Sequence, residues 1–129
     1  MTALKPIQIK ATEDTPYVNL DKDNNKFEIS GKSFPEDPTV FYSQILQWLE
    51  TYIQEPSPFT IFEIKFSYFN SASAKQLLKI FVALSKISNT FSTTIIWYYE
   101  AGDKIMRIKG EGYKNMVPIA FEIKEIVAI

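Results

Sequence analysis

The sequence contains neither cysteine nor histidine. Without cysteine there can be no disulfide, thiol nucleophile or thiolate metal ligand, and without histidine the commonest general base and zinc ligand is missing. Arginine is nearly absent too, because Arg107 is the only arginine among 14 basic residues. Few bidentate clamps for phosphate-rich ligands are therefore possible. These absences exclude much of enzyme chemistry, and we expect no cofactor and no catalytic activity.

Strong charge and long hydrophobic runs are also absent. The formal net charge is −1, with lysines and carboxylates interspersed, so we expect no nucleic-acid partner and no attraction to anionic lipid. The longest apolar run, 94–99, is far shorter than the roughly 20 residues of a membrane span, and the beginning of the chain lacks a signal-peptide core. We therefore expect a cytoplasmic protein without membrane insertion.

What remains is typical of one folded domain. The chain has 129 residues, of which 46% are hydrophobic and 22% charged, and no segment has the composition of a linker. We expect residues 1–129 to form a single domain.

Hydrophobic periodicity predicts alternating strands and helices. Two proline signals bound the first helix: Asp37 before Pro38 suits an N-cap with proline at the first helical position, and Pro56 follows the end of the apolar stripe. The other predicted segments are extended at 6–10, 15–20 and 27–30, strands at 59–69, 93–99 and 117–126, a helix from Ala72 to about residue 87, and a short helix at 103–108 ending near Gly110 or Gly112.

This order, written β-β-α-β-α-β-α-β, predicts an α/β fold with a mixed sheet and helices packed mainly on one face. Within strand 59–69, alternation places Tyr68 on the same side as Phe62, Ile64 and Phe66. Strand 93–99 is apolar on both faces and is expected to be central and the best buried. We expect Trp97, Tyr98 and Tyr99 of this strand, and Trp48 of the first helix, to be core residues.

If the protein were an enzyme, its catalytic or metal-binding groups would have to be carboxylates. The densest pairs are Glu13-Asp14, Glu36-Asp37 and Glu100 with Asp103. A small carboxylate and magnesium enzyme would need such side chains to converge in one pocket. Acidic pairs in loops are more often solvated surface, and Gly110-Glu111-Gly112 reads as a turn because no Lys-Ser/Thr follows it as in a phosphate-binding loop.

The most informative stretch runs from Tyr68 to Lys75, where a strand pattern changes into a helical one. Asn70 or Ser71 can cap the helix, which is the structural interpretation and the better one on residue chemistry alone. A hydroxyl at this position would also be exposed beside the positive end of the helix dipole, where a phosphate is tolerated and Lys75 lies one turn away. A regulatory site is therefore the second interpretation.

Several motifs occur in an order that resembles the SiaC family of bacterial regulatory phosphoproteins. They are Thr15-Pro16, 33–36 (Ser-Phe-Pro-Glu), the 41–49 helix, 68–75 (Tyr-Phe-Asn-Ser-Ala-Ser-Ala-Lys) and 97–99 (Trp-Tyr-Tyr). The resemblance covers nearly the whole chain and implies a STAS-like fold. The family's phosphoacceptor threonine falls on Ser71, its next serine on Ala72 and its last on Ser73, which is the fallback acceptor, while Lys75 keeps its place.

The resemblance also implies a partner-switching system. A cognate protein kinase would phosphorylate the protein, a metal-dependent Ser/Thr phosphatase would restore it, and the unmodified form would bind a diguanylate cyclase or another client protein. A phosphoryl group adds a charge of about −1.5 to −2, which is costly to bury against an apolar or acidic partner. The candidate contact residues are Phe34, Pro35, Glu36, Tyr68, Phe69, Asn70 and Lys75, and core packing is an equal alternative for Phe34, Tyr68 and Phe69.

A second functional hypothesis needs no phosphorylation. The strands that alternate cleanly leave one face of the sheet without helices, and such a face could serve a constitutive scaffold or dimerisation domain. In that case substitution of Ser71 by a charged residue would be neutral, whereas substitutions on the open sheet face would disrupt binding.

Overall fold

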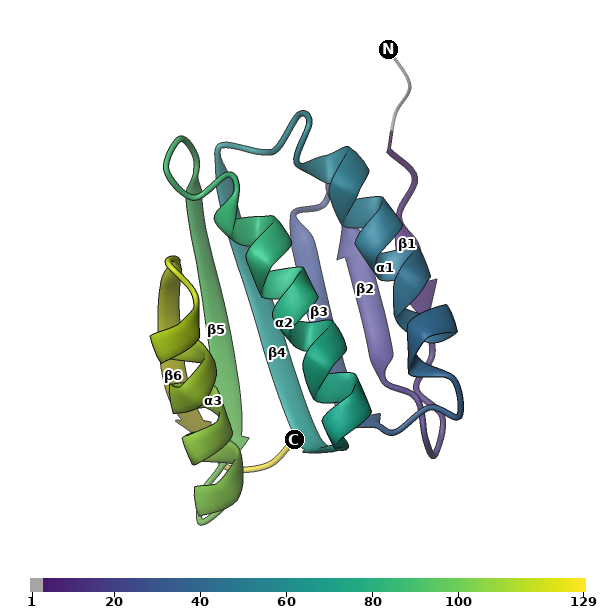
Figure 1. Cartoon of the computed structure of the whole chain (residues 1–129), viewed down its shortest axis with the longest axis vertical. Helices are drawn as coiled ribbons and strands as arrows, with labels where there is room; N and C mark the ends of the chain where they lie inside the picture. Colours follow the sequence, from purple (N-terminus) through teal and green to yellow (C-terminus); the bar gives the residue numbers. More distant parts are fainter. Residues whose placement is uncertain (1–3) are drawn as a thin grey trace.

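A computed structural model describes residues 4–129 and shows three helices packed on one face of a six-stranded sheet (Figure 1). The strands follow one another across the sheet in chain order. The elements are β1 (Ile7–Ile9), β2 (Tyr17–Asp21), β3 (Lys26–Ser33), α1 (Pro38–Tyr52), β4 (Phe59–Phe69), α2 (Ser71–Ser85), β5 (Ser92–Glu100), α3 (Lys104–Met116) and β6 (Ala120–Ile126).

The connections explain why the helices share one face. β1, β2 and β3 pair antiparallel, whereas β3 through β6 pair parallel, so each parallel step needs a crossover helix. Right-handed crossovers that all move in the same direction across the sheet place α1, α2 and α3 on the same side. The expected mixed α/β fold with helices on one face is confirmed. The chain opens with three strands, however, where the predicted order has two.

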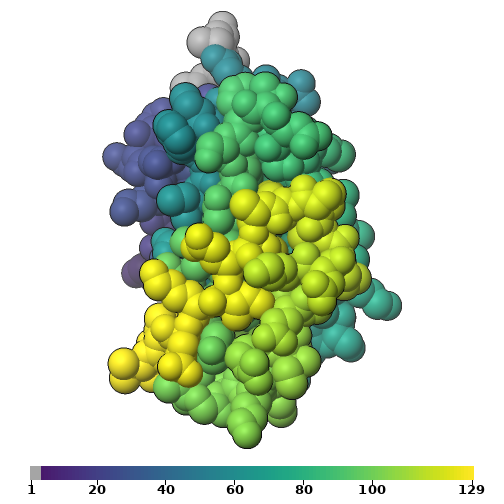
Figure 2. Space-filling model, turned by 90° about the vertical axis from the view of Figure 1, so that its left-hand side faces the viewer, coloured from purple at the N-terminus to yellow at the C-terminus, as the bar shows by residue number. Residues whose placement is uncertain are grey.

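Seen from the side, the sheet ends at β6 and α3 lies next to it (Figure 2). No helix within residues 4–129 is long and apolar enough to span a membrane.

The first helix forms as its sequence signals predict. The Asp37 side chain accepts a hydrogen bond from the Val40 amide at 3.2 Å, and Pro38 occupies the first turn. The apolar stripe of α1 is buried through Tyr42, Ile45, Trp48, Leu49 and Tyr52.

The last helix is longer than predicted. α3 runs from Lys104 to Met116 straight through Gly110 and Gly112, so the expected helix end and turn at these glycines are wrong. Gly110 is needed for packing instead: a Cβ at this position would lie 2.4 Å from Cδ1 of Trp97, whereas a Cβ at Gly112 would meet nothing within 4 Å. The missing side chain at residue 110 lets α3 approach the sheet.

β5 is not buried on both faces. Trp97 is fully buried among the rings of Phe69, Phe81, Tyr113 and Phe121. The alternate side chains of β5 face away from the helices and are half-buried, so the predictions of a doubly covered strand and of a core position for Tyr98 are wrong.

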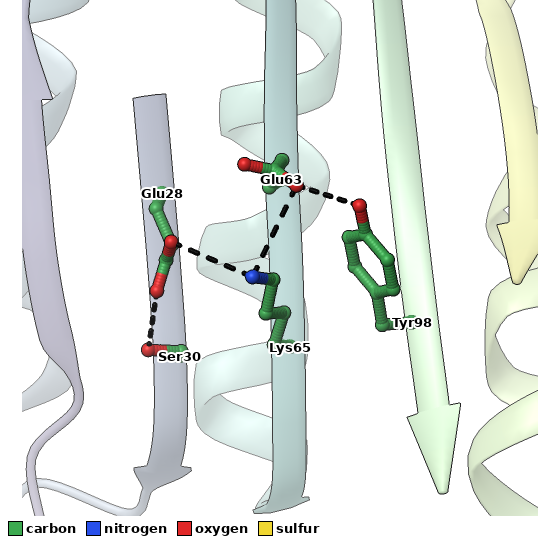
Figure 3. A network of polar contacts seen from close by, with 5 residues as sticks. All are labelled: Glu28, Ser30, Glu63, Lys65 and Tyr98. Carbon is green, nitrogen blue, oxygen red and sulfur yellow. Dashed lines mark hydrogen bonds and ion pairs between the residues drawn. The ribbon is translucent and has the colours of Figure 1, made fainter. Parts of the chain in front are cut away.

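Tyr98 belongs to a polar network on the open sheet face (Figure 3). Its hydroxyl donates to the Glu63 carboxylate at 2.6 Å, and the Lys65 ammonium lies 3.7 Å from Glu28 and 4.0 Å from Glu63. The loss of water around the ring, followed by the hydrogen bond to the carboxylate, raises the pKa of Tyr98 to about 12. The polar side chains of this face therefore satisfy one another.

A β-bulge near the end of β4 changes which residues face the helices. Gly31 of β3 pairs with Phe66 but Lys32 pairs with Tyr68, so Ser67 is the extra residue, and Gly31 has a φ of 103°. This left-handed conformation favours glycine. Beyond the bulge the alternation is inverted: Phe69 is buried at 3% exposure and Tyr68 is 48% exposed. The prediction that Tyr68 shares a side with Phe66 is therefore wrong.

Candidate functional site

The candidate site lies at the sheet edge where β3, β4 and β5 end (Figure 1). Because these strands are parallel, their carboxyl ends meet at one edge, which is where loops in such sheets carry ligand and partner contacts. β4 passes directly into α2 through Asn70, and the Asn70 amide donates to the Ser33 carbonyl at 3.1 Å. The strand-to-helix junction is thus held on the end of β3.

Asn70, and not Ser71, is the N-cap of α2. Its side-chain oxygen accepts a hydrogen bond from the Ser73 amide at 2.9 Å, with Asn70 itself in extended conformation. Ser71 is the first helical residue and is exposed, and its hydroxyl has no hydrogen bond to any residue of the described part of the chain. The structural interpretation of Ser71 as a cap therefore does not apply, and its hydroxyl is accessible.

Ser73 lies in the opposite environment and cannot serve as the fallback acceptor in the folded protein. It is fully buried, and its hydroxyl donates to the Ser33 carbonyl at 3.0 Å and accepts from the Ser33 hydroxyl at 2.9 Å. The Ser33 hydroxyl also lies 2.6 Å from that of Tyr42. Burial raises the pKa of Tyr42 to about 12, against the lowering effect of its two serine partners. These hydroxyls join the ends of β3, α1 and α2 under the junction.

The aromatic residues named from the sequence separate into two groups. Phe34 is 38% exposed and Tyr68 48% exposed, and their rings meet edge to face at 5.7 Å. Glu36, two residues after Phe34, is exposed as well. Pro35 and Phe69 are buried, so their side chains support this edge from below. For Phe69, the alternative of core packing is the one the structure shows.

A hollow of 440 Å³ opens between α2 and α3 beside Ser71. Phe69, Asn70, Ser71 and Lys75 line it together with Ala74 and Leu78 of α2, and from α3 Lys109, Gly112, Tyr113 and Met116 complete it. We call it the α2–α3 groove. Sequence reasoning missed its α3 wall because the predicted helix stops before these residues. The available signal was the three-and-four spacing of Met106, Gly110 and Tyr113, which form the buried face of α3.

Two contacts hold α3 against the start of α2. The Tyr113 hydroxyl donates to the Ala74 carbonyl at 2.7 Å, and burial raises the pKa of Tyr113 above the ordinary tyrosine range. The ammonium of Lys109 lies 4.5 Å from the centre of the Phe69 ring, a cation–π distance. The groove therefore has an apolar floor and basic side chains near Ser71.

The carboxylate pairs do not form a metal centre. Within residues 4–129, no group of three or more histidine, cysteine, aspartate or glutamate side chains could hold a metal ion. Asp37 and Asp103 instead cap the helices α1 and α3, and Asp103 accepts from the Met106 amide at 3.0 Å.

The accessible hydroxyl of Ser71, the exposed rings of Phe34 and Tyr68 and the α2–α3 groove make this end of the sheet a candidate binding surface. Residues 9–126 match the family of SiaC regulatory phosphoproteins. The chain belongs to this SiaC family, whose members are regulators and not enzymes.

Individual relatives are distant in sequence and close in fold. An uncharacterised protein of Pseudomonas aeruginosa (strain UCBPP-PA14) is 19% identical over 94% of this chain and 97% of its own length. Crystal structures of SiaC from Pseudomonas aeruginosa superpose on 93% of this chain, each at 19% identity. The structure of apo-SiaC has a TM-score of 0.84 over 98% of its chain, and SiaC as the activator in complex with the diguanylate cyclase SiaD has one of 0.86 over 99%. This similarity shows that the chain has the SiaC fold.

Proposed function

We propose that the protein is a non-enzymatic signalling protein whose phosphorylation at Ser71 controls its binding to a partner protein. The observation that carries the proposal is that Asn70, and not Ser71, caps α2. The Ser71 hydroxyl is therefore exposed and makes no hydrogen bond within the described residues. Membership in a family of regulatory phosphoproteins supports the modification. A cognate protein kinase would add the phosphate, and a metal-dependent Ser/Thr phosphatase would remove it.

The proposed partner is a diguanylate cyclase, by analogy with the SiaC structure determined in complex with the cyclase that it activates. The contact surface would be built on the exposed rings of Phe34 and Tyr68, with Glu36, Asn70 and Lys75 around them. Pro35 and Phe69 would act from below by holding the loop and the strand end in place.

Charge gives the mechanism of control. A phosphate on Ser71 would sit at the helix N-terminus, where the dipole tolerates negative charge, so the fold should persist. The same charge would stand in the centre of the contact surface, and removing it from water against an apolar partner costs several kcal/mol. Partner binding would be lost while the domain stays folded.

The test compares Ser71→Asp with Ser71→Ala in binding to a diguanylate cyclase from the same organism. We expect Ser71→Asp to lose most of its affinity and Ser71→Ala to retain it, with circular dichroism and melting nearly unchanged in both. Ser92→Asp is the matched control, because Ser92 is also exposed but lies where β5 begins, at the opposite edge of the sheet. Full binding by Ser71→Asp would contradict the proposal.

The constitutive scaffold hypothesis predicts the reverse result. One observation favours it: Ile61 on the open sheet face is 51% exposed. Under that hypothesis Ile61→Asp would abolish association and Ser71→Asp would not. The polar side chains around Lys65 bond to one another, which is typical of a sheet face that water covers. We therefore expect Ile61→Asp to leave partner binding intact.

A further inference from the structure

We propose that Lys109 of α3 is the basic residue that binds the phosphate on Ser71, so that phosphorylation ties α3 to the start of α2 across the mouth of the α2–α3 groove. This inference rests on the proposed modification of Ser71. The residue proposed to bind the phosphate thus lies on a different helix from the modified serine.

The register between α2 and α3 places Lys109 beside Ser71. Both helices follow parallel strands, so they run in the same direction (Figure 1). The hydrogen bond from Tyr113 to the Ala74 carbonyl pairs the two helices at one level. One turn back along each helix leads from Tyr113 to Lys109 and from Ala74 to Ser71. Both of these residues line the groove.

Lys109 has no stronger attachment in the unmodified protein. It makes no ion pair with any residue between 4 and 129; the nearby Glu111 pairs with Arg107 at 3.3 Å. Its ammonium lies over the face of the Phe69 ring. A cation–π contact at a half-exposed site is weaker than a charge-assisted hydrogen bond to a phosphate oxygen. Once a phosphate is present, the ammonium therefore moves from the ring to the phosphate.

Lys75 alone would not produce this effect. It lies one turn after Ser71 on the same helix and is exposed, so its pairing with a phosphate stays within α2. Lys109 reaches from α3, and its pairing joins two helices. The phosphate and the two ammonium groups of Lys75 and Lys109 then lie together across the opening of the groove.

The test uses the full chain with phosphoserine installed at residue 71 and measures the second pKa of the phosphate by phosphorus NMR. A free phosphoserine has a second pKa of about 6, and a nearby cation lowers it. We expect a depression of about half a unit to one unit in the otherwise native chain. Lys109→Met should remove the part of this depression that Lys109 supplies and leave the part that comes from Lys75 and the helix N-terminus, whereas Lys109→Arg should keep the whole depression.

Lys114→Met is the matched control, because Lys114 is on α3, is exposed and is not in the groove. Methionine keeps the apolar stem over Phe69, and a melting curve checks that each variant is folded. Proton NMR of Lys109 tests whether its ammonium leaves the Phe69 ring. The side-chain protons of Lys109 should show a ring-current shift in the unmodified chain and lose it after phosphorylation.

An unchanged phosphate pKa in Lys109→Met, or equal effects of Lys109→Met and Lys114→Met, would overturn the inference. Because the phosphoserine is installed during synthesis, the result does not depend on a cellular kinase. If the native protein proves to be unmodified in cells, the proposed function fails. The phosphate pKa still shows whether Lys109 binds a phosphate on Ser71.

Discussion

Two serine hydroxyls in the first turn of α2 lie in opposite surroundings, although one residue separates them. Ser71 is exposed with no hydrogen-bond partner in the described chain, whereas Ser73 is fully buried and bonded twice to Ser33. Successive helical residues turn by about 100°, so positions two apart point to nearly opposite sides. The inner hydroxyl therefore stabilises the junction, and the outer one is exposed to solvent.

Alanine substitutions at these two positions should separate stability from regulation. Ser73→Ala removes a donor to the Ser33 carbonyl and an acceptor for the Ser33 hydroxyl in a buried site. We expect it to lower the free energy of unfolding by about 1–2 kcal/mol. Ser71→Ala should change it by less than about 0.5 kcal/mol, as at other surface positions. Urea denaturation of both variants measures the difference, and equal losses would contradict this assignment.

Sequence patterns lead to this segment but not to the role of each hydroxyl. Asn70 and Ser71 are both good caps, and the choice depends on the backbone of Asn70, which is held by the Ser33 carbonyl from another strand. The burial of Ser73 likewise depends on Ser33 and Tyr42, which are distant in sequence. Such contacts follow from the tertiary fold and leave no local signal.

At the scale of elements, α3 shows how a local rule can be overridden by packing. Glycine is a poor helix former and commonly follows helix ends, so the two glycines favour a stop. The helix continues because its buried face gains contacts beyond the glycines, where the Tyr113 ring packs against the rings of Phe81 and Trp97. The groove and the position of Lys109 follow from this continuation, against which the local glycine rule argues.

The two glycines of α3 make a matched pair for a stability test. Gly110→Ala places a methyl group against the Trp97 ring, and we expect a loss of about 1–3 kcal/mol in the free energy of unfolding. Gly112→Ala meets open space and should stabilise the helix by up to about 1 kcal/mol. Urea denaturation with near-ultraviolet circular dichroism of the tryptophans provides the measurement. Equal effects of the two substitutions would show that α3 does not pack as described.

The bulge in β4 is the second element that periodicity could not predict. The alternation of Phe62, Ile64 and Phe66 is regular, and nothing in the residues after it marks the inserted Ser67. The cause lies in the neighbouring strand, where Gly31 adopts a left-handed conformation. Its consequence for the candidate site is that Tyr68 is exposed and its ring lies next to that of Phe34.

At the scale of the whole molecule, the two faces of the sheet have different roles. The helices bury one face around Trp97 and Phe81, and the other face is solvated and carries its own polar network. The candidate site lies where the two layers end, with Ser71 in the helix layer and Tyr68 at the end of the sheet. A charge at Ser71 thus lies outside the core, and the fold need not change for binding to change.

The buried phenols of this architecture should make the protein sensitive to alkali. Burial raises the pKa of Tyr42 from 10.0 to about 12, and the pKa of Tyr113 is raised as well. Above the unfolded pKa of about 10, the unfolded chain has lost protons that the folded protein retains, so the free energy of unfolding falls as pH rises from 10 through 12. The stability present below pH 10 is therefore lost over this range.

Urea denaturation at a series of pH values measures this slope. Each buried tyrosine contributes a fall of about 1.4 kcal/mol per pH unit within the window. Tyr42→Phe should be less stable at neutral pH, because the Ser33 hydroxyl loses a partner, yet its curve should be flatter above pH 10. Tyr98→Phe should flatten the curve less, since water reaches the open face where Tyr98 lies. A Tyr42→Phe curve parallel to that of the native protein would show that the hydroxyl cluster beneath Ser71 is open to solvent, because only a phenol kept from water retains its proton through this range.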